Sequence, residues 1–320
     1  MNEMKFALLS VTYSGLFYAG GPLSIEQQIY KAKELGFDAL AIETKRPVAS
    51  PLDLTKADRT RITEISKDQN IPICAIESLS NFTGRCMEDR ENNFAMMRLV
   101  LQLASDLNIN LVKVFAAWPG IINDEHEIAI YAPYERGSYY KRLYPEALRK
   151  WNHAVQGIRA LADEAADLGI TLALQNHAPV ITPGYEDVLT MVQEIDRKNV
   201  KLCLDVPLFY DRQSDEYVKE AVNKTAEYIV MTHYGAWNFS QADSGEVIQD
   251  PAPSFGGQIN YGAFIEAMQE NNYGGYLISE YCLPQIKNHE IAGIEQVDIA
   301  NKQALQYMKK IVAGTKELVH

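Results

Sequence analysis

Four side chains of metal-ligand type stand where short apolar segments end: Gln175, Asp205, His233 and Glu280. A carboxylate that ends an apolar strand is costly to desolvate unless it is paired, protonated or bound to a metal. Asp205, His233 and Glu280 offer the oxygen, nitrogen and oxygen donors that suit Mn²⁺, Mg²⁺, Co²⁺ or Zn²⁺. Each residue alone has an ordinary structural explanation, such as a core histidine or a salt-bridge partner. Their joint placement predicts one divalent metal ion, Mn²⁺ foremost.

Other polar residues at strand ends are candidates for catalysis and substrate binding. His177 lies two residues after Gln175 and so points to the same side of the strand, where it could act as a base. Glu43 and Glu77 could bind hydroxyl groups of a substrate or support the metal ligands. Lys113 lies inside a strand and needs a carboxylate partner such as Glu77 or Glu43, with a smaller chance of polarising a carbonyl. The aromatic residues that could stack on a ring of the substrate are Trp118, Trp237, Tyr13 and Phe17.

The elements that must position these residues alternate along the chain. Short apolar runs are predicted as strands over residues 6–11, 39–43, 73–78, 111–116, 171–176, 200–205, 228–233 and 275–280. Amphipathic stretches are predicted as helices over residues 24–35, 53–68, 90–107, 145–168, 184–195, 215–225, 261–271 and 294–312. Eight strand and helix units without a linker predict one (β/α)₈ barrel over residues 1–320.

Local signals support the boundaries of these elements. Ser24 and Asp53 are expected as helix N-caps. Gly36, Asn108 and Gly169 are expected at left-handed helix ends, each followed within a few residues by a strand. Residues 119–144 and 235–258 are too long for minimal loops after the fourth and seventh strands. Because the carboxyl ends of barrel strands share one mouth, we expect both to border the substrate site, although oligomer contacts would explain their aromatic residues nearly as well.

The composition indicates which partners and cellular locations are disfavoured. The 320 residues include 42 acidic and 30 basic side chains, a formal charge of −12, which disfavours nucleic acid. No apolar run approaches the roughly 20 residues needed to cross a bilayer, and the first residues lack a secretion signal. The four cysteines have no CxxC spacing, which indicates reduced thiols and a cytoplasmic location, with Cys74 and Cys203 facing the core.

The strand-end set and residues 35–43 (LGFDALAIE) resemble the xylose-isomerase-like, sugar phosphate isomerase/epimerase superfamily of TIM barrels over nearly the whole chain. In that family the positions matching Gln175, Asp205, His233 and Glu280 are usually Glu, Asp, His and Glu. The resemblance implies that they bind one divalent metal and act on ketoses or related polyols by proton transfer. Here Gln175 departs from the pattern.

An amide can ligate a metal but cannot act as a base near neutral pH. With Gln175 as a ligand, the ion and its ligands would be neutral together instead of carrying one negative charge, which weakens metal binding but favours an enolate. His177 could replace the lost base, with Glu280 as the second catalytic group. A Gln-x-His arrangement resembles the lyase branches, especially the catalytic subunit of C-glycoside deglycosidases, which act on 3-oxo-glucosides with a smaller β subunit.

We therefore expect a metal-dependent lyase that cleaves an oxidised (3-oxo) glycoside such as a C-glycoside, in an oligomer that could include that β subunit. A ketose isomerase or epimerase is the second hypothesis, and a sugar-binding or scaffolding subunit with a decayed metal site is a third. The zinc endonucleases of the superfamily, which cut abasic DNA, need many histidine ligands and a basic surface, and the acidic chain disfavours them.

Overall fold

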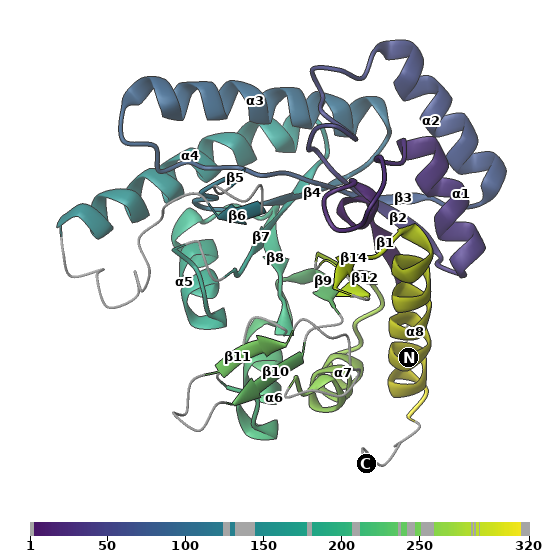
Figure 1. Cartoon of the computed structure of the whole chain (residues 1–320). Coiled ribbons are helices and arrows are strands. Elements are labelled where there is room, and N and C mark those ends of the chain that lie inside the picture. Colours follow the sequence, from purple (N-terminus) through teal and green to yellow (C-terminus); the bar gives the residue numbers. More distant parts are fainter. Residues whose placement is uncertain are drawn as a thin grey trace.

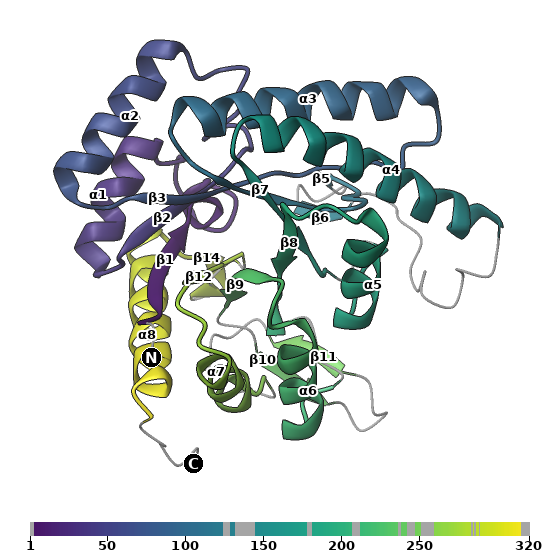
Figure 2. The ribbon, with the colours of Figure 1, turned by 180° about the vertical axis from the view of Figure 1, so that it is seen from behind.

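The computed structural model describes residues 3–123, 129–131, 145–177, 181–206, 212–235, 238–241, 247–250, 259–282, 284, 286–287 and 289–314. Within them, eight parallel strands form a closed barrel in the order β1-β12-β9-β8-β7-β4-β3-β2. Figures 1 and 2 show these strands from two sides, with helices packed around them. The predicted (β/α)₈ barrel is confirmed.

The barrel strands lie close to the predicted positions. They are β1 (Lys5–Leu9), β2 (Ala39–Glu43), β3 (Ile73–Glu77), β4 (Leu111–Val114), β7 (Thr171–Gln175), β8 (Val200–Cys203), β9 (Ile229–Tyr234) and β12 (Tyr276–Ser279). The first strand is shorter than predicted, because the chain turns into a 3₁₀ helix, η1 (Ser10–Tyr13), directly after Leu9. Three two-stranded sheets lie outside the barrel: β5 (Ile121–Asn123) with β6 (Ala129–Tyr131), β10 (Asn238–Gln241) with β11 (Val247–Asp250), and β13 (Ile286–Lys287) with β14 (Glu290–Ile291).

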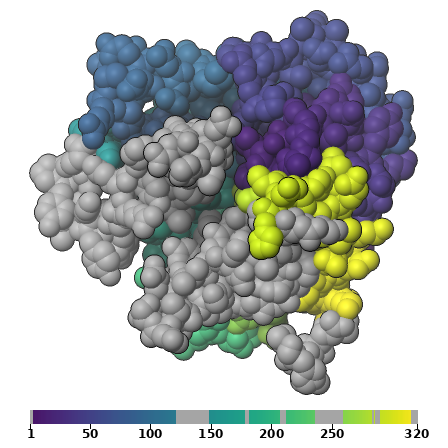
Figure 3. Space-filling model, in the orientation of Figure 1, coloured from purple at the N-terminus to yellow at the C-terminus, as the bar shows by residue number. Residues whose placement is uncertain are grey.

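The eight helices also match the predicted pattern. They are α1 (Ile25–Leu35), α2 (Lys56–Gln69), α3 (Met87–Asp106), α4 (Pro145–Asp167), α5 (Tyr185–Ile195), α6 (Asp215–Thr225), α7 (Tyr261–Glu270) and α8 (Ile294–Val312). Figure 3 shows the outer surface, where α8, in yellow, lies beside the purple N-terminal part of the chain. Described residues include no helix long and apolar enough to span a membrane.

Helix ends confirm most of the expected local signals. Ser24 caps α1 through a reciprocal hydrogen-bond pair with Gln27. The expected cap at Asp53 is wrong, because Thr55 caps α2 and Asp53 instead forms an exposed ion pair with Arg46. The three left-handed helix ends are confirmed, with φ angles of 87° at Gly36, 57° at Asn108 and 68° at Gly169.

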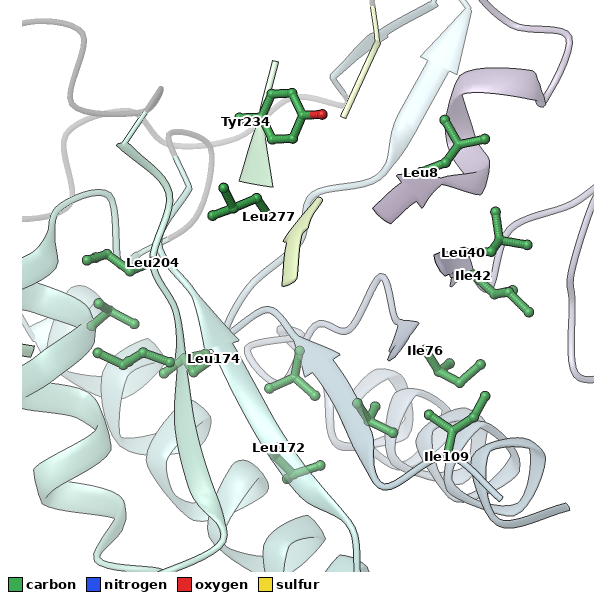
Figure 4. Close-up of a cluster of buried hydrophobic side chains, with 14 of the residues drawn as sticks. Leu8, Leu40, Ile42, Ile76, Ile109, Leu172, Leu174, Leu204, Tyr234 and Leu277 are labelled. Atoms are coloured by element: carbon green, nitrogen blue, oxygen red, sulfur yellow. The ribbon is translucent and has the colours of Figure 1, made fainter. Parts of the chain in front are cut away.

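Strand alternation divides the core into two layers. Side chains between the barrel and the helices form the larger layer, which includes Ile42, Ile76, Leu174, Leu204 and Tyr234 (Figure 4). Inside the barrel lies a smaller layer of small or slender residues: Ala7, Leu9, Val11, Ala39, Ala41, Ala75, Ala173, Cys203, Met231 and Ile278. Each outward residue is followed or preceded by one that points inward. The polar residues beside these five side chains therefore face the barrel interior: Glu43, Glu77, Gln175, Asp205 and His233.

The cysteines fit this layering in part. Cys203 is buried inside the barrel as predicted, whereas Cys74 is only partly buried. All four cysteines are free thiols.

Candidate active site

Three of the predicted metal ligands lie within hydrogen-bonding distance of one another inside the barrel. Gln175 Nε2 is 2.5 Å from Asp205 Oδ2 and 3.1 Å from His233 Nδ1. His233 Nδ1 is 3.0 Å from Asp205 Oδ2, and all three side chains are at least 97% buried. The residues come from β7, the end of β8 and β9, which are neighbours in the barrel.

Glu280, directly after β12, approaches the same histidine from the next strand. Its Oε2 lies 3.7 Å from His233 Nδ1, and 23% of its side chain is exposed, so it reaches farther toward solvent than the other three. Burial raises its pKa, and the neighbouring anions Asp205 and Glu77 add to that effect. The other three predicted ligands, Gln175, Asp205 and Glu280, thus surround Nδ1 of His233.

The other ring nitrogen of His233, Nε2, forms a hydrogen bond with Glu77. Its Oε1 lies 2.9 Å from Nε2, and its Oε2 pairs with Lys113 Nζ at 3.4 Å. A histidine that ligates a metal usually donates its second N–H to a carboxylate, which fixes the tautomer and the ring orientation. Nε2 is therefore the donor to Glu77, and Nδ1 is directed at Asp205, Gln175 and Glu280.

A divalent cation fits this arrangement. Asp205 Oδ2 and His233 Nδ1 point toward each other at 3.0 Å, and Gln175 Oε1 is buried without a hydrogen-bond partner. Because an amide can exchange its oxygen and nitrogen by a half-turn, Gln175 can present that oxygen to the same point. The donor set of two carboxylates, one imidazole and one amide oxygen suits Mg²⁺, Mn²⁺, Co²⁺ or Zn²⁺.

Cys203, for which the sequence predicted no function at the site, also contacts this cluster. Its Sγ lies 3.4 Å from Asp205 Oδ1 and 3.6 Å from His233 Nδ1, so Cys203, Asp205 and His233 alone are close enough to share an ion. Burial raises the pKa of the thiol, however, which keeps it protonated. Since thiolate is the form that binds metal, we favour the set with Gln175 and Glu280. Its position two residues before Asp205 on one strand was the available signal.

The electrostatics of the cluster are those of a cation site. Burial alone would raise the pKa of Asp205, but the His233 charge and hydrogen bonds lower it below its usual range. Burial alone would lower the pKa of His233, but the Asp205 carboxylate raises it well above 6.5.

Asn176 fixes the distance between two ligand strands. Its Oδ1 accepts from the backbone N–H of Asp205, and its Nδ2 donates to the backbone carbonyl of Asp205, at 2.9 and 3.2 Å. The Asp205 carboxylate in turn accepts from the backbone N–H of His233 at 2.8 Å. These bonds hold the ends of β7, β8 and β9 together beyond the last strand residues.

His177 lies near the metal-ligand cluster, edge-on against a stacked pair of aromatic rings. Its ring lies edge-on to Phe115 and Trp118, at centroid distances of 5.4 and 5.3 Å, and those two rings stack at 4.6 Å. Burial lowers the pKa of His177 to about 3, so the ring is neutral and a weak proton acceptor. Phe115 was not predicted as a site residue, and its ring centroid lies 3.9 Å from Lys113 Nζ. Its place two residues after Lys113 was the available signal.

The remaining predicted substrate contacts separate into three groups. Glu77 and Lys113 are almost fully buried; Lys113 pairs with Glu77, as predicted, and Glu77 also contacts His233. Glu43 and Trp118 retain 8% and 9% exposure at the same end of the barrel. Trp237 lies outside the described residues, as do most of residues 119–144 and 235–258.

The fold and the site define the protein as a parallel (β/α)₈ barrel with a cluster of potential metal ligands inside it. Comparison with known proteins identifies the family. The chain belongs to the xylose isomerase-like TIM barrel family, whose model matches residues 29–310. No curated protein sequence is significantly similar to it.

Solved structures of similar fold cover nearly the whole chain. D-psicose 3-epimerase of Clostridium cellulolyticum H10, solved with D-tagatose, has a TM-score of 0.71, 16% identity and coverage of 97% of this chain and 99% of that one. A 3-keto-D-glucoside 4-epimerase from E. coli has a TM-score of 0.65, 16% identity and coverage of 96% and 100%. A xylose isomerase-like protein from Mycobacterium smegmatis, in complex with magnesium, has a TM-score of 0.69, 15% identity and coverage of 99% and 100%.

Proposed function

We propose that the protein is a divalent-metal-dependent carbohydrate isomerase or epimerase, which moves a proton at a carbon beside a sugar ketone. The observation that carries this proposal is the environment of His233, whose Nε2 is held by Glu77 while Nδ1 faces Asp205, Gln175 and Glu280. Family membership and the sugar epimerases of the same fold support it. They favour this function over the lyase expected from the Gln-x-His pattern.

In this function, the site residues would bind the metal, remove the proton and orient the ligands. Gln175, Asp205, His233 and Glu280 would hold the ion, which when bound polarises the sugar carbonyl and stabilises negative charge on its oxygen. Glu280, the most exposed of the four, would remove the proton from the neighbouring carbon. Glu77 would orient His233, and the stacked rings of Phe115 and Trp118 would exclude water beside the substrate.

A lyase acting on a 3-oxo-glycoside remains the second candidate, and one observation favours it. Gln175 cannot accept a proton, and an elimination needs removal of a proton from only one carbon. The C-glycoside substrate and a β subunit belong to that candidate. The cytoplasmic location and an oligomeric state remain predictions for either function.

The test is to incubate metal-loaded protein with ketohexoses and 3-oxo-glucosides in D₂O and to follow deuterium and products by NMR. We expect deuterium at the carbon beside the ketone together with an isomerised or epimerised sugar. Asp205→Asn should abolish both signals, whereas Asp167→Asn, the same change at an exposed residue of α4, should alter neither.

Three other results would contradict the proposal in different ways. Release of the aglycone without any isomer would identify the lyase. Sugar binding without deuterium incorporation, together with negligible Mn, Mg, Co and Zn after reconstitution, would identify a binding subunit with a decayed metal site. Deuterium incorporation that survives in Asp205→Asn would place the chemistry elsewhere.

A further inference from the structure

The half of the barrel opposite the metal ligands carries a second row of ionisable groups. In the strand register, Glu43 on β2 pairs with Glu77 on β3, and Glu77 pairs with Lys113 on β4. Glu43 follows Ala39 and Ala41 at alternate positions, and both alanines belong to the core inside the barrel. All three side chains therefore point inward at one level.

Glu43 differs from its two neighbours in that its carboxyl group makes no hydrogen bond or ion pair among the described residues. Glu77 holds His233 and pairs with Lys113, whereas among the described residues no hydrogen bond or ion pair reaches the Glu43 carboxyl. The one hydrogen bond of Glu43 to a side chain is made by its backbone N–H, which donates to Ser10 Oγ at 2.8 Å. A buried carboxyl without a partner is costly, and such groups gather at functional sites.

The proposed reaction lacks one group that this carboxyl can supply. Inversion at a carbon needs one group that takes a proton and a second that returns one from another direction. Glu280 can serve as the first, but Gln175 stands at the strand where the second carboxylate is expected and cannot carry a proton. Among the described groups, Glu77 is paired with Lys113, and burial lowers the pKa of His177 to about 3, which makes it a poor proton carrier near neutral pH.

We propose that Glu43 is the second acid–base residue of the site and returns a proton to the substrate carbon. This assignment rests on the proposed isomerase or epimerase function. Glu43 and Glu280 leave β2 and β12, the two strands that flank β1, so the two carboxyl groups belong to different strands of the same mouth, with one strand between them.

The protonation state of Glu43 suits a donor. Burial raises its pKa to about 7, against the opposing effect of Lys113 and Lys45 and with a contribution from Glu77 and Glu280. The Cys282 thiol, which donates to Glu280 at 3.6 Å, also feels the Glu43 charge. Near neutral pH, Glu43 is therefore present both as an acid and as a carboxylate.

The proton transfers balance within the site. Glu280 takes the proton from carbon, the C–H electron pair forms the C=C bond of an enediolate, and the carbonyl π pair moves to oxygen. When the carbonyl re-forms, the C=C pair takes the proton from Glu43 on the other side of the carbon. Glu280 ends protonated and Glu43 ionised, and exchange with water restores both groups.

The test separates exchange from inversion. In D₂O, Glu43→Gln should still incorporate deuterium through Glu280, at a rate within about tenfold of the wild type. Formation of the epimer should fall by roughly 10²–10⁴-fold, the usual contribution of one acid–base group. Glu64→Gln, the same change on the exposed face of α2, should leave both rates unchanged.

A substrate-free measurement accompanies this test. The infrared band of a protonated carboxyl should titrate near neutral pH in the wild type and in Glu64→Gln, and should be missing in Glu43→Gln. Loss of that band only in Glu43→Gln supports the assignment, and its persistence overturns it.

The failures are distinguishable. Epimer formation by Glu43→Gln at the wild-type rate, or equal loss of exchange and inversion, would overturn the function of Glu43 while leaving the proposed reaction intact. A metal-loaded wild type that neither exchanges deuterium nor converts any of the sugars would overturn the proposed reaction, and the assignment of Glu43 with it.

Discussion

Gln175 differs from a carboxylate in both charge and proton affinity, and its position beside Asp205 and His233 makes both differences matter. As a neutral ligand it contributes an oxygen without offsetting the charge of a metal ion. The site should therefore bind a divalent cation more weakly than one with a glutamate at this position, while the bound ion withdraws electrons more strongly from a carbonyl.

Gln175→Glu should raise the affinity for Mn²⁺ by about tenfold or more, because it places a further negative charge in a buried site. Competition with a fluorescent chelator measures this affinity. Gln303→Glu, which adds the same charge on the exposed side of α8, is the matched control and should have no effect. Equal affinities in Gln175→Glu and the wild type would mean that residue 175 does not contact the ion.

Glu43 also predicts a dependence of stability on pH. Its pKa of about 7 in the folded protein lies above the ordinary value of 4.5, so the folded state binds this proton more tightly than the unfolded state. Stability is therefore greatest while Glu43 is protonated and falls as the pH rises toward about 7. Each unit of pKa corresponds to about 1.4 kcal/mol, so the ionised residue costs about 3 kcal/mol.

Glutamine has no proton to lose at this position. Relative to the wild type, Glu43→Gln should gain about 2–3 kcal/mol in unfolding free energy between about pH 5 and pH 8. Urea unfolding at the two pH values measures the change, with Glu64→Gln as the control. A difference between Glu43→Gln and the wild type that is the same at both pH values would show that Glu43 does not titrate in this range.

The candidate ligands could be predicted from the sequence because a parallel barrel brings all strand ends to one mouth. Support of the metal ligands was one of the two functions predicted for Glu77. The particular atom that it contacts, His233 Nε2, could not be predicted, since that contact spans the barrel and depends on the side chain that each strand turns inward. Cys203 and Phe115 were missed because an apolar residue within a strand looks the same whether it packs against the core or borders a site.

At the scale of elements, α2 shows how a helix start is selected. Thr55 Oγ1 accepts from the backbone N–H of Asp58, and the Asp58 carboxylate accepts from the backbone N–H of Thr55, at 3.2 and 2.9 Å. This reciprocal pair satisfies two backbone groups near the helix start, whereas Asp53 lies too early to reach the first turn.

Thr55→Ala should lower the unfolding free energy by about 1 kcal/mol, the typical cost of losing an N-cap. Thermal and urea unfolding measure the loss. Asp53→Ala is the control, and it should leave the unfolding midpoint near that of the wild type, because its pair with Arg46 is exposed. If Asp53→Ala lowered the unfolding free energy more than Thr55→Ala did, Asp53 would be the N-cap.

The order of strands and helices was predictable because apolar periodicity differs between the two kinds of element. Three helix ends could also be predicted, because each needs a residue that adopts the left-handed backbone conformation: Gly36, Asn108 and Gly169. The hairpins β5–β6, β10–β11 and β13–β14 were not predicted, because long polar loops carry little periodicity.

At the scale of the whole molecule, an ion held by four strands should stabilise the folded barrel. At a concentration about 100 times its dissociation constant, Mn²⁺ should add about 2.7 kcal/mol to the unfolding free energy. Thermal unfolding after EDTA treatment, with and without added Mn²⁺, measures the gain. His233→Ala should abolish it, and an equal gain in that variant would show that the ion binds elsewhere.

The hydrogen bond between His233 and Glu77 joins the two halves of the chain across the barrel. Every proposed metal ligand follows residue 170, while the carboxylate that orients His233 comes from β3. A folding intermediate in which only the C-terminal half has formed would thus hold the ligands but leave the imidazole free to rotate. Tight metal binding should appear late in folding, when the ring of strands closes, and would serve as a signal of that closure.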